Sequence, residues 1–501
     1  MLTESRGRRW LLSYAVTFLV LVIFLSIALL VQGYWKGINE FLGDVIGLRV
    51  NYVMLIAAFS VLPLVYSLVL MVGSLRILVR NDHVRPRRLN KILPPTLSLL
   101  YLLIFFALAL LWGDDRVLLF EALEYLSPFI IVGVQTVLVV TAYVVAPSFV
   151  AAMQAIQSST TRRKARAGLV VMVLLATYVA AFVNPFFLVP SNVTRGLQSM
   201  KPLTIGHRCG AALGPENTLE AAEASLLHGI SGIEVDVRIS LDGVPFLMHD
   251  DSLERTTDVA DAFPGRENED ASWFNASELE TLNAGAWFVR VDPFESIAQG
   301  LVTAAALTEY QGAGIPTLSD VLDFAVNEGL ILNVDFRPPP VGHPFHSDYL
   351  NTCLTILHSA GIDDHIWVTS GNTTWLDFTG QHFPEMITAL RVDVSSAPSV
   401  TISTSMTYDM LNCYHGLDAS FFSACDQSGI PVNAWTVNAL FRYDQLWCLG
   451  VDYVTTDYPH AFAQLDMPMW SIPLETYYAI WFIGGVALAL AVIIRLVQSK
   501  K

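Results

Sequence analysis

The chain has 501 residues, of which 53% are apolar and only 15% charged, with a mean hydropathy of +0.49. This composition excludes a disordered protein and one that coats nucleic acid, and it indicates a membrane protein. The net charge of −16 conceals two regions of opposite sign. Residues 191–472 contain 36 acidic and 10 basic side chains, whereas the remainder contains 9 and 19.

Six apolar stretches without a charged residue are long enough to cross a bilayer. A helix of about 20 apolar residues spans the hydrocarbon core, because every backbone amide must be hydrogen-bonded there. The first stretch is interpreted as a retained helix and not as a signal peptide, since it is long and has no small-residue cleavage site. The six stretches are residues 11–32, 52–75, 92–112, 126–150, 167–190 and 476–494.

The distribution of basic residues predicts the orientation of these helices. Sixteen of the nineteen basic residues outside the acidic region fall in tails and loops that six spans place on one side, and such basic loops stay cytoplasmic. We therefore expect a multi-pass protein of the plasma membrane with both termini cytoplasmic and residues 191–472 extracellular or lumenal. The predicted domains are five transmembrane helices in 1–190, a globular domain in 191–472, and the sixth helix with its tail in 473–501.

Sequons and cysteines agree with an outer domain in an oxidising, glycosylating compartment. Asn192, Asn275 and Asn372 begin sequons and are candidate glycosylation sites of a glycoprotein. All five cysteines also lie in this region. If four of them pair, three connectivities are open, of which a Cys413–Cys425 bridge is one hypothesis.

Residues 191–472 alternate short β-rich runs with helical ones, which favours βα units around a parallel sheet. A region of 282 residues has the size of a TIM-type (β/α)8 barrel, inserted between the fifth and sixth helices. A doubly wound open sheet is the alternative within the α/β class, although no GxGxxG follows the first strand. The expected strands are residues 203–208, 232–239, 244–250, 330–336, 365–370, 387–392, 431–437 and 452–457.

Charged residues interrupt several of these runs, which would be almost wholly apolar if they only filled a core. Glu234 and Asp236 are spaced i, i+2, so both carboxylates project from one face of a strand. Asp335 and Arg337 repeat this spacing in a second strand. One such residue alone is more often solvated or structural. In a parallel barrel, however, the strand ends gather at the face that carries active sites, and His207, Arg208, His249 and Asp250 also end strand runs.

A group of three carboxylates predicts a cation. Carboxylates in contact repel one another unless a proton or a cation intervenes. An all-oxygen site selects a hard divalent ion, so we favour one Ca²⁺, with Mg²⁺ as the alternative, whereas Zn²⁺ prefers His and Cys ligands. With one such ion, the three carboxylates and two arginines carry a single excess positive charge, which one phosphodiester neutralises. His207 and His249 suit general acid and base catalysis at phosphorus.

The segment from Gly206 to Thr257 resembles the glycerophosphodiester phosphodiesterase family, whose pattern runs from HRG and PENT through ExD and DG to HD. Here it reads GHRCGAALGPENTLEAAEASLLHGISGIEVDVRISLDGVPFLMHDDSLERTT. The resemblance continues in LNAGAWF, IPTL, AWTVN and GVDYVTTDYP, over nearly the whole outer domain. It implies a TIM-type barrel that hydrolyses glycerophosphodiesters, with either an open or a cyclic phosphate as product. The six-helix arrangement resembles the membrane-bound branch of the family, which implies glycerophosphoinositol, glycerophosphocholine or glycosylphosphatidylinositol anchors as substrates in lipid metabolism.

The resemblance also implies roles for individual residues. His207 and His249 match the acid/base pair, Glu234 and Asp236 match two metal ligands, and Asp335 stands where a Glu is usual. Arg208 matches the phosphate-binding arginine of HRG, and Arg337 replaces a lysine. Glu216 and Asn217 of PENT and Trp435 of AWTVN are candidates for the substrate pocket.

Cys209 departs from the pattern, because it replaces the glycine of HRG. If that position requires a positive φ, a side chain there costs on the order of 1 kcal/mol, unless Gly210 absorbs the turn. The segment 256–314 is long for a connection and is a candidate lid, with Trp273, Phe274, Trp287 and Phe288 as its aromatic residues.

Two other classes of function compete with the hydrolase. A transporter is disfavoured because the spans contain no charged residue. A catalytically inactive receptor or adhesion domain on a barrel scaffold is disfavoured by the complete set of histidines, carboxylates and arginines.

Overall fold

The computed structural model describes residues 4–80, 86–112, 116–158, 161–187, 189–194, 200–396 and 407–500. The chain divides into two compact units, one formed by residues 1–197 and 471–501 and the other by residues 198–470. The boundaries differ slightly from the expected 191 and 472. Strand β1 (Val193–Thr194) pairs in parallel with β11 (Ile472–Pro473), so these two short segments belong to the helical unit.

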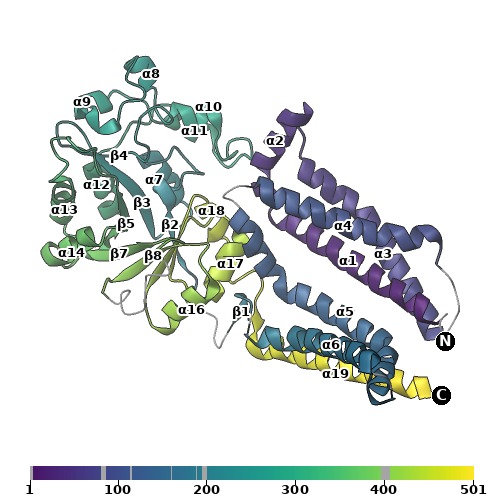
Figure 1. Cartoon of the computed structure of the whole chain (residues 1–501). Helices are drawn as coiled ribbons and strands as arrows, with labels where there is room; N and C mark the ends of the chain where they lie inside the picture. The colour runs from purple at the N-terminus through teal and green to yellow at the C-terminus, as the bar shows by residue number, and fades with distance from the viewer. Residues whose placement is uncertain are drawn as a thin grey trace. The chain divides into compact units, whose positions relative to one another are not determined.

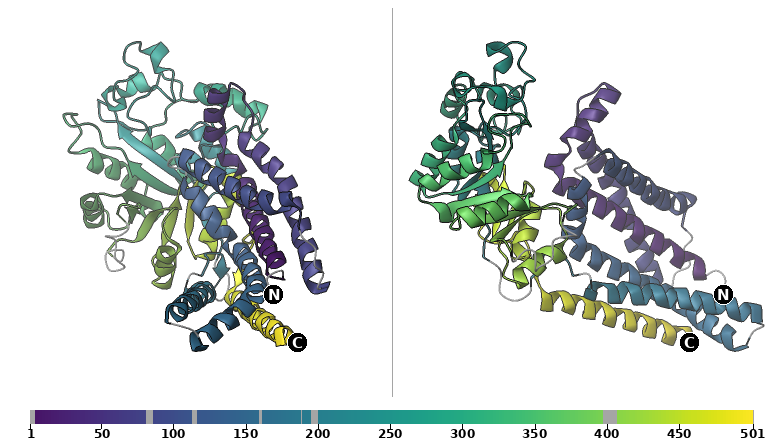
Figure 2. Two further views of the ribbon diagram at one scale, coloured as in Figure 1. Left: turned by 45° about the vertical axis from the view of Figure 1, so that its right-hand side comes forward. Right: turned by 60° about the vertical axis from the view of Figure 1, so that its left-hand side comes forward.

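The first unit is built from long helices. Figures 1 and 2 show α1 beside α3 and α4, and α5 beside α6 and α19. The 3₁₀ turn η1 (Gln32–Tyr34) and the short helix α2 connect α1 to α3. The helices are α1 (Glu4–Leu30), α2 (Lys36–Ile46), α3 (Tyr52–Arg80), α4 (Arg88–Leu111), α5 (Arg116–Ser158), α6 (Thr161–Phe187) and α19 (Leu474–Lys500).

Five helices among the described residues are long and apolar enough to cross a membrane. The fifth predicted span, 167–190, falls largely on α6, where a shorter apolar stretch, Val171–Ala180, is found. The six-span topology therefore stays a prediction. The five segments are Ser13–Leu30, Tyr52–Ser74, Arg88–Leu111, Val117–Tyr143 and Leu474–Val497.

The second unit contains a closed barrel of eight parallel strands in the part of the chain that the structure describes (Figure 1). The strand order is β2-β10-β9-β8-β7-β6-β5-β3, and pairing of β2 with β3 closes the ring. The TIM-type fold predicted from the sequence is thus confirmed. The strands are β2 (Leu203–Gly206), β3 (Gly232–Ile239), β5 (Ile331–Phe336), β6 (Ile366–Ser370), β7 (Ile387–Val392), β8 (Met410–Tyr414), β9 (Val432–Trp435) and β10 (Tyr453–Thr456).

Helices follow most of the barrel strands, and their apolar side chains pack with those of the strands in one large buried cluster. Thr218 caps α7 by accepting a hydrogen bond from the Ala221 amide, and α12 begins with a capping box between Thr317 and Asp320. The main helices are α7 (Leu219–Leu226), α12 (Leu318–Glu328), α13 (Tyr349–Ser359), α14 (Thr373–His382), α16 (Ala419–Gln427), α17 (Leu440–Cys448) and α18 (Pro459–Ala463).

The assignment of one barrel strand from the sequence was wrong. Strand β4 (Pro245–Leu247), within the expected run 244–250, pairs antiparallel with β3 and lies outside the ring. The remaining barrel strand is β8, which was not expected because a polar residue, Asn412, stands at its centre. That asparagine points into the barrel, where it is hydrogen-bonded.

The interior of the barrel is layered, because every second residue of each strand points inward. At the amino-terminal end, Ile205, Trp367, Ala389 and Met410 form an apolar cluster. The next layer is polar and fully buried. On β3, Glu234 is level with Asn333 of this layer, and Asp236 and Asp335 come one inward step later. The polar layer consists of Asn333, Thr369, Asn412, Asn433 and Thr455, joined by hydrogen bonds of 2.6–3.3 Å.

The candidate lid is a folded insertion between β4 and α12. Phe274 packs in one small buried cluster, and Trp287 and Phe288 pack in another. These aromatic residues therefore stabilise the insertion itself and do not form an exposed flap. Its helices are α8 (Val259–Ala262), α9 (Ala276–Leu279), α10 (Ala286–Val291) and α11 (Ala304–Tyr310), with a 3₁₀ turn, η4 (Ala271–Trp273).

The five cysteines, all within the described residues, are free thiols. The hypothesis of a Cys413–Cys425 bridge is therefore wrong. Both residues are buried in the apolar cluster between the sheet and its helices, where they pack as small hydrophobic side chains.

Candidate active site

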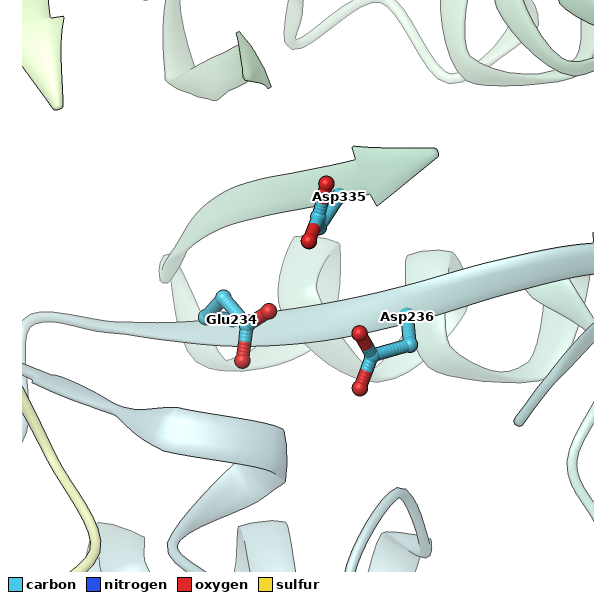
Figure 3. A group of neighbouring side chains, drawn as sticks. All are labelled: Glu234, Asp236 and Asp335. Carbon is cyan, nitrogen blue, oxygen red and sulfur yellow. The ribbon is translucent and has the colours of Figure 1, made fainter. Parts of the chain in front are cut away.

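The three predicted metal ligands meet at the carboxyl-terminal half of the barrel. Glu234 and Asp236 project to the same side of β3, and Asp335 on β5 is the register partner of Asp236 (Figure 3). One carboxylate oxygen from each residue lies within 4.8 Å of the other two. Glu234 and Asp236, two positions apart on β3, thus lie beside Asp335, which is far from them along the chain.

The electrostatics of this cluster fit a bound cation. Burial, and then the charge of Asp236, raise the pKa of Glu234 to about 7. Burial also opposes ionisation of Asp236, but Arg337 and Arg208 outweigh it and lower the pKa of that carboxyl. The Glu234 side of the cluster therefore has less compensating positive charge than the Asp236 side. Buried carboxylate oxygens are the donor set that a hard divalent ion prefers, so these residues fit Ca²⁺ or Mg²⁺.

Arg337 lies between two of the carboxylates. Its Nε and Nη2 donate to Asp236 Oδ1 at 3.0 and 2.8 Å, and Nη2 also lies 2.9 Å from Asp335 Oδ2. Arg391, near the end of β7, approaches the same Asp335 oxygen at 3.4 Å. Arginine charge is thus concentrated at the Asp335 side of the site.

Arg208 places an unused donor in the site. Its backbone amide donates to Glu234 Oε2 at 2.7 Å, and its Nη1 donates to Glu216 Oε1 at 3.0 Å. Its Nε is buried and has no hydrogen-bond acceptor among the described residues; the nearest carboxylate, Asp236, is 3.6 Å away. An unpaired buried donor is costly, and a phosphate oxygen would satisfy it.

The turn that carries Arg208 has three successive residues with positive φ: 47° at Arg208, 69° at Cys209 and 96° at Gly210. Gly210 therefore does not absorb the turn alone, and Cys209 bears part of the strain. Gly210 is required for a different reason, since a Cβ there would lie 1.9 Å from Ser225 Oγ. The Cys209 thiol is fully buried, and burial raises its pKa well above the ordinary value, as expected for an inert thiol.

His207 is held by a carboxylate that the sequence interpretation did not single out. Its Nδ1 donates to Asp457 Oδ1 at 2.7 Å, and Asn438 donates to the other Asp457 oxygen at 2.6 Å. This leaves Nε2 facing the site, 3.9 Å from Glu234 Oε2. Burial lowers the pKa of His207, but Asp457 and Glu234 outweigh it and raise this pKa to about 9.

His249 reaches the site by a different route from the one expected. It follows β4, which runs back along β3, and the preceding Met248 amide donates to Asp236 O at 2.9 Å. Its Nδ1 donates to Asp250 Oδ1 at 2.8 Å. Asp250 in turn accepts from Arg255, which also donates two hydrogen bonds to Glu216. A continuous network thus links His249 to Arg208.

Two of the three candidates for the substrate pocket are hydrogen-bonded to other residues around the site. Glu216 binds Arg208 and Arg255. Asn217 exchanges two hydrogen bonds with Asp236, of 2.9 and 3.1 Å. Trp435, at the end of β9, is half-buried; its indole donates to Asn412 O, and Arg391 lies 5.8 Å from its ring.

The three sequons lie in different environments. Asn192 is buried, and its Nδ2 donates to Tyr125 O at 3.0 Å, so its amide is not presented to solvent. Asn275 is half-buried and takes part in the capping box of α9. Asn372 is exposed and caps α14.

A simple extension of the sequence pattern would have found the missed residues. Inward positions repeat every second residue, so β7 gives Ile387, Ala389 and Arg391. The same count along β10 gives Tyr453, Thr455 and Asp457. Continuing each strand by one inward step past its apolar run places both Arg391 and Asp457 at the mouth of the barrel.

Known proteins are similar in sequence to this chain over much of its length. The profile of the Glycerophosphoryl diester phosphodiesterase family matches residues 207–461. "Glycerophosphodiester phosphodiesterase domain-containing protein 5" from Gallus gallus is 29% identical over 489 residues, covering 96% of this chain and 78% of the relative. The Homo sapiens protein of that name is 30% identical over 379 residues, which cover 75% of this chain but only 60% of the relative. "Glycerophosphoinositol inositolphosphodiesterase GDPD2" from Mus musculus is 28% identical over 479 residues, covering 94% and 85%.

Proposed function

Because the chain belongs to the glycerophosphoryl diester phosphodiesterase family of hydrolases, we propose that it hydrolyses glycerophosphodiesters at the site formed by Glu234, Asp236 and Asp335. One observation carries this proposal. The carboxylate cluster, the buried and unpaired Nε of Arg208, and His207 with its Asp457 partner come together at one end of a single barrel. This combination offers a place for a cation, a donor for a phosphate oxygen and a group that can move a proton.

Glu234, Asp236 and Asp335 would hold one divalent cation, Ca²⁺ in preference to Mg²⁺. Such an ion polarises a phosphoryl oxygen and lowers the pKa of an attacking hydroxyl or water. The chain's own residues supply the rest. Arg208 and Arg337 bind the phosphate through charge-assisted hydrogen bonds. One of His207 and His249 accepts the proton of the attacking oxygen, and the other donates a proton to the leaving alcohol as its P–O bond breaks.

Two carboxylates keep the histidines in place for these steps. Asp457 accepts the Nδ1 proton of His207, and Asp250 accepts that of His249, so each ring presents Nε2 to the substrate. Asp250 and Glu216 are themselves fixed by Arg255. Arg255 therefore helps to position both His249, through Asp250, and Arg208, through Glu216.

Glycerophosphoinositol is the substrate we propose first, with glycerophosphocholine and lipid-linked diesters such as glycosylphosphatidylinositol anchors as alternatives. The name of the mouse relative supports this order. We further propose that the barrel faces the outside of the plasma membrane and that both termini are cytoplasmic, on the evidence of the basic loops.

The test is a hydrolysis assay of the full chain in detergent on these three substrates, with Ca²⁺, with Mg²⁺ or with chelator. We expect turnover of glycerophosphoinositol that requires a divalent ion and is lost in His207→Ala and His249→Ala. His365→Ala is the matched control, since His365 also pairs through Nδ1 with an aspartate, Asp364, at 3.0 Å, but lies outside the site. Absence of turnover with every substrate and ion would contradict the proposal and favour a receptor or adhesion role.

A further inference from the structure

We infer that α2 lies along the membrane interface with its apolar face in the lipid, at the end of the helical unit where the chain passes into the barrel. The connections to its neighbours are short. Five residues separate α2 from the end of α1, and five separate it from the start of α3. Five extended residues reach at most about 17 Å, so α2 cannot move far from the ends of two helices that are apolar enough to cross the membrane.

The helix has two distinct faces. At 100° per residue, Ile38, Phe41, Leu42, Val45 and Ile46 share one side, and the charged residues Lys36, Glu40 and Asp44 share the other. Ile38 is buried against the unit, but most of the apolar side is not covered. The exposed fractions are 51% for Phe41, 68% for Val45, 58% for Ile46 and 59% for Leu48, which follows the helix.

Specific contacts hold α2 in this orientation. Trp35, just before the helix, is buried, and its indole donates to Ala28 O near the end of α1 at 3.0 Å. Its ring lies 4.1 Å from that of Trp112, at the end of α4. Asn39 Oδ1 accepts from the Val53 amide in the first turn of α3. The polar edge of α2 and Ile38 are thus held against the bundle, whereas Phe41, Val45 and Ile46 are left uncovered.

The same contacts locate α2 at one end of the bundle. Ala28, Trp35, Val53, Trp112 and Leu119 line one small apolar cavity, so the end of α1 and of α4 and the start of α3 and of α5 lie together. Further along α5, Tyr125 O accepts from Asn192, next to β1. Tryptophan is enriched at membrane–water interfaces, and Trp35 and Trp112 stand where such a boundary is expected.

Lipid is the occupant that fits this face. Interfacial helices insert an apolar side and keep a charged side in water. Many also carry several lysines or arginines that bind anionic headgroups, whereas α2 has one lysine and two acidic residues. Its attachment to α1 and α3 removes the need for that attraction. The insertion we infer is therefore apolar and does not require anionic lipid.

The test is spin labelling of the full chain in phosphatidylcholine nanodiscs. Single cysteines replace Phe41 or Val45 on the apolar face, and Glu40 or Asp44 on the charged face as matched controls. Collisions with oxygen, which concentrates in lipid, are compared with collisions with a water-soluble nickel complex. We expect the ratio of oxygen to nickel accessibility to be several-fold higher at Phe41→Cys and Val45→Cys than at Glu40→Cys and Asp44→Cys. The unsubstituted chain, treated in the same way, gives the background from the native thiols.

Two outcomes would overturn the inference. Nickel accessibility at Phe41→Cys and Val45→Cys equal to that of the controls would place the face in water. An immobilised label with little access to either reagent would show that protein covers the face. None of these readings depends on hydrolysis, so failure of the proposed activity would leave this test unaffected.

Discussion

At the scale of single residues, Asp457 is the group on which the orientation of His207 depends. It accepts the Nδ1 proton at 2.7 Å, and Asn438 fixes it from the other side. We expect Asp457→Asn to lower kcat by about 10- to 100-fold with little change in KM, because an amide is a weaker partner for the ring and can stabilise the wrong tautomer. Kinetics on the preferred diester measures this effect.

Asp363→Asn is the matched control for that substitution. Asp363 also binds a histidine Nδ1, that of His358, at the end of α13 and away from the carboxylate cluster. We expect its kcat to equal that of the unsubstituted chain. An Asp457→Asn variant with unchanged kcat would show that the contact with His207 is only structural.

Cys209 is the position at which backbone strain can be measured. At φ 69°, Ala retains a cost of about 1 kcal/mol that Gly does not pay. We therefore expect Cys209→Gly to have a higher midpoint of thermal unfolding than Cys209→Ala, although both lose the buried sulfur. The same pair at Cys353, buried inside helix α13, should show the opposite order, by about 1 kcal/mol. If the Ala variant were more stable than the Gly variant at both positions, backbone strain at Cys209 would be excluded.

Glu234 links the cation to stability. If the three carboxylates hold a divalent ion, adding it at 100 times its dissociation constant should stabilise the chain by about 2.7 kcal/mol. We expect this rise in unfolding midpoint with Ca²⁺ or Mg²⁺, its removal by chelator, and its loss in Glu234→Gln. Glu328→Gln, at an exposed position of α12, should keep the full rise. An equal rise in both variants would place the ion elsewhere.

At the scale of elements, the polar layer of the barrel is a source of stability that can be tested at its centre. Asn433 on β9 donates to Asn412 Oδ1 at 2.7 Å and to Thr455 Oγ1 at 2.8 Å, and all three residues are buried. Asn433→Leu would leave both partners unsatisfied, at about 1–3 kcal/mol each, so we expect a lower unfolding midpoint. Asn351→Leu, exposed on α13, should change stability by no more than about 0.5 kcal/mol.

This layer also explains how far the sequence could predict the fold. Runs such as Gly232–Ile239 and Ile387–Val392 are dominated by β-branched and aliphatic residues, and both form strands with the expected bounds. Strand β8 was missed because Asn412 interrupts its apolar pattern. The burial of this asparagine is compensated by its hydrogen bonds with Thr369 and Asn433. Single-strand patterns do not contain this information, since the partners belong to neighbouring strands.

The candidate site was likewise predictable from the sequence only in part. The i, i+2 spacing placed Glu234 and Asp236 together without any knowledge of the fold, and strand ends placed Asp335 near them. The position of His249 depends on β4 running antiparallel to β3, which the sequence does not indicate. Glu216 stays a candidate for the substrate pocket on the family motif alone, and its hydrogen bonds to Arg208 and Arg255 could not be predicted because they depend on tertiary contacts.

At the scale of the whole molecule, the two units differ in charge, as we expect of one unit in lipid and one in water. The acidic region, 191–472, has 36 acidic residues against 10 basic ones, which disfavours adhesion to an anionic membrane surface. We expect covalent attachment through the apolar helices to keep the barrel near lipid without such attraction. The pairing of β1 with β11 brings the two connections together at the boundary of the helical unit.

The number of helices that cross the membrane decides on which sides the barrel and the termini lie. If α6 crosses, the barrel lies opposite both termini. If it does not, the barrel shares the side of the amino terminus, and the carboxyl terminus lies opposite. Five segments qualify clearly, but α6 has 27 residues and is roughly 40 Å long, enough for a core of about 30 Å. Residues 167–190 also lack charge, so we expect six crossings.

Epitope tags at the two termini and in the insertion between β4 and α12 distinguish these arrangements in intact and permeabilised cells. We expect antibody to reach the insertion tag from outside and both terminal tags only after permeabilisation. Joint neutralisation of Arg162, Arg163, Lys164 and Arg166 at the start of α6 should weaken this bias, because these charges hold that end in the cytoplasm. A carboxyl-terminal tag exposed in intact cells, with the insertion tag protected, would mean that α6 does not cross and that the barrel is cytoplasmic.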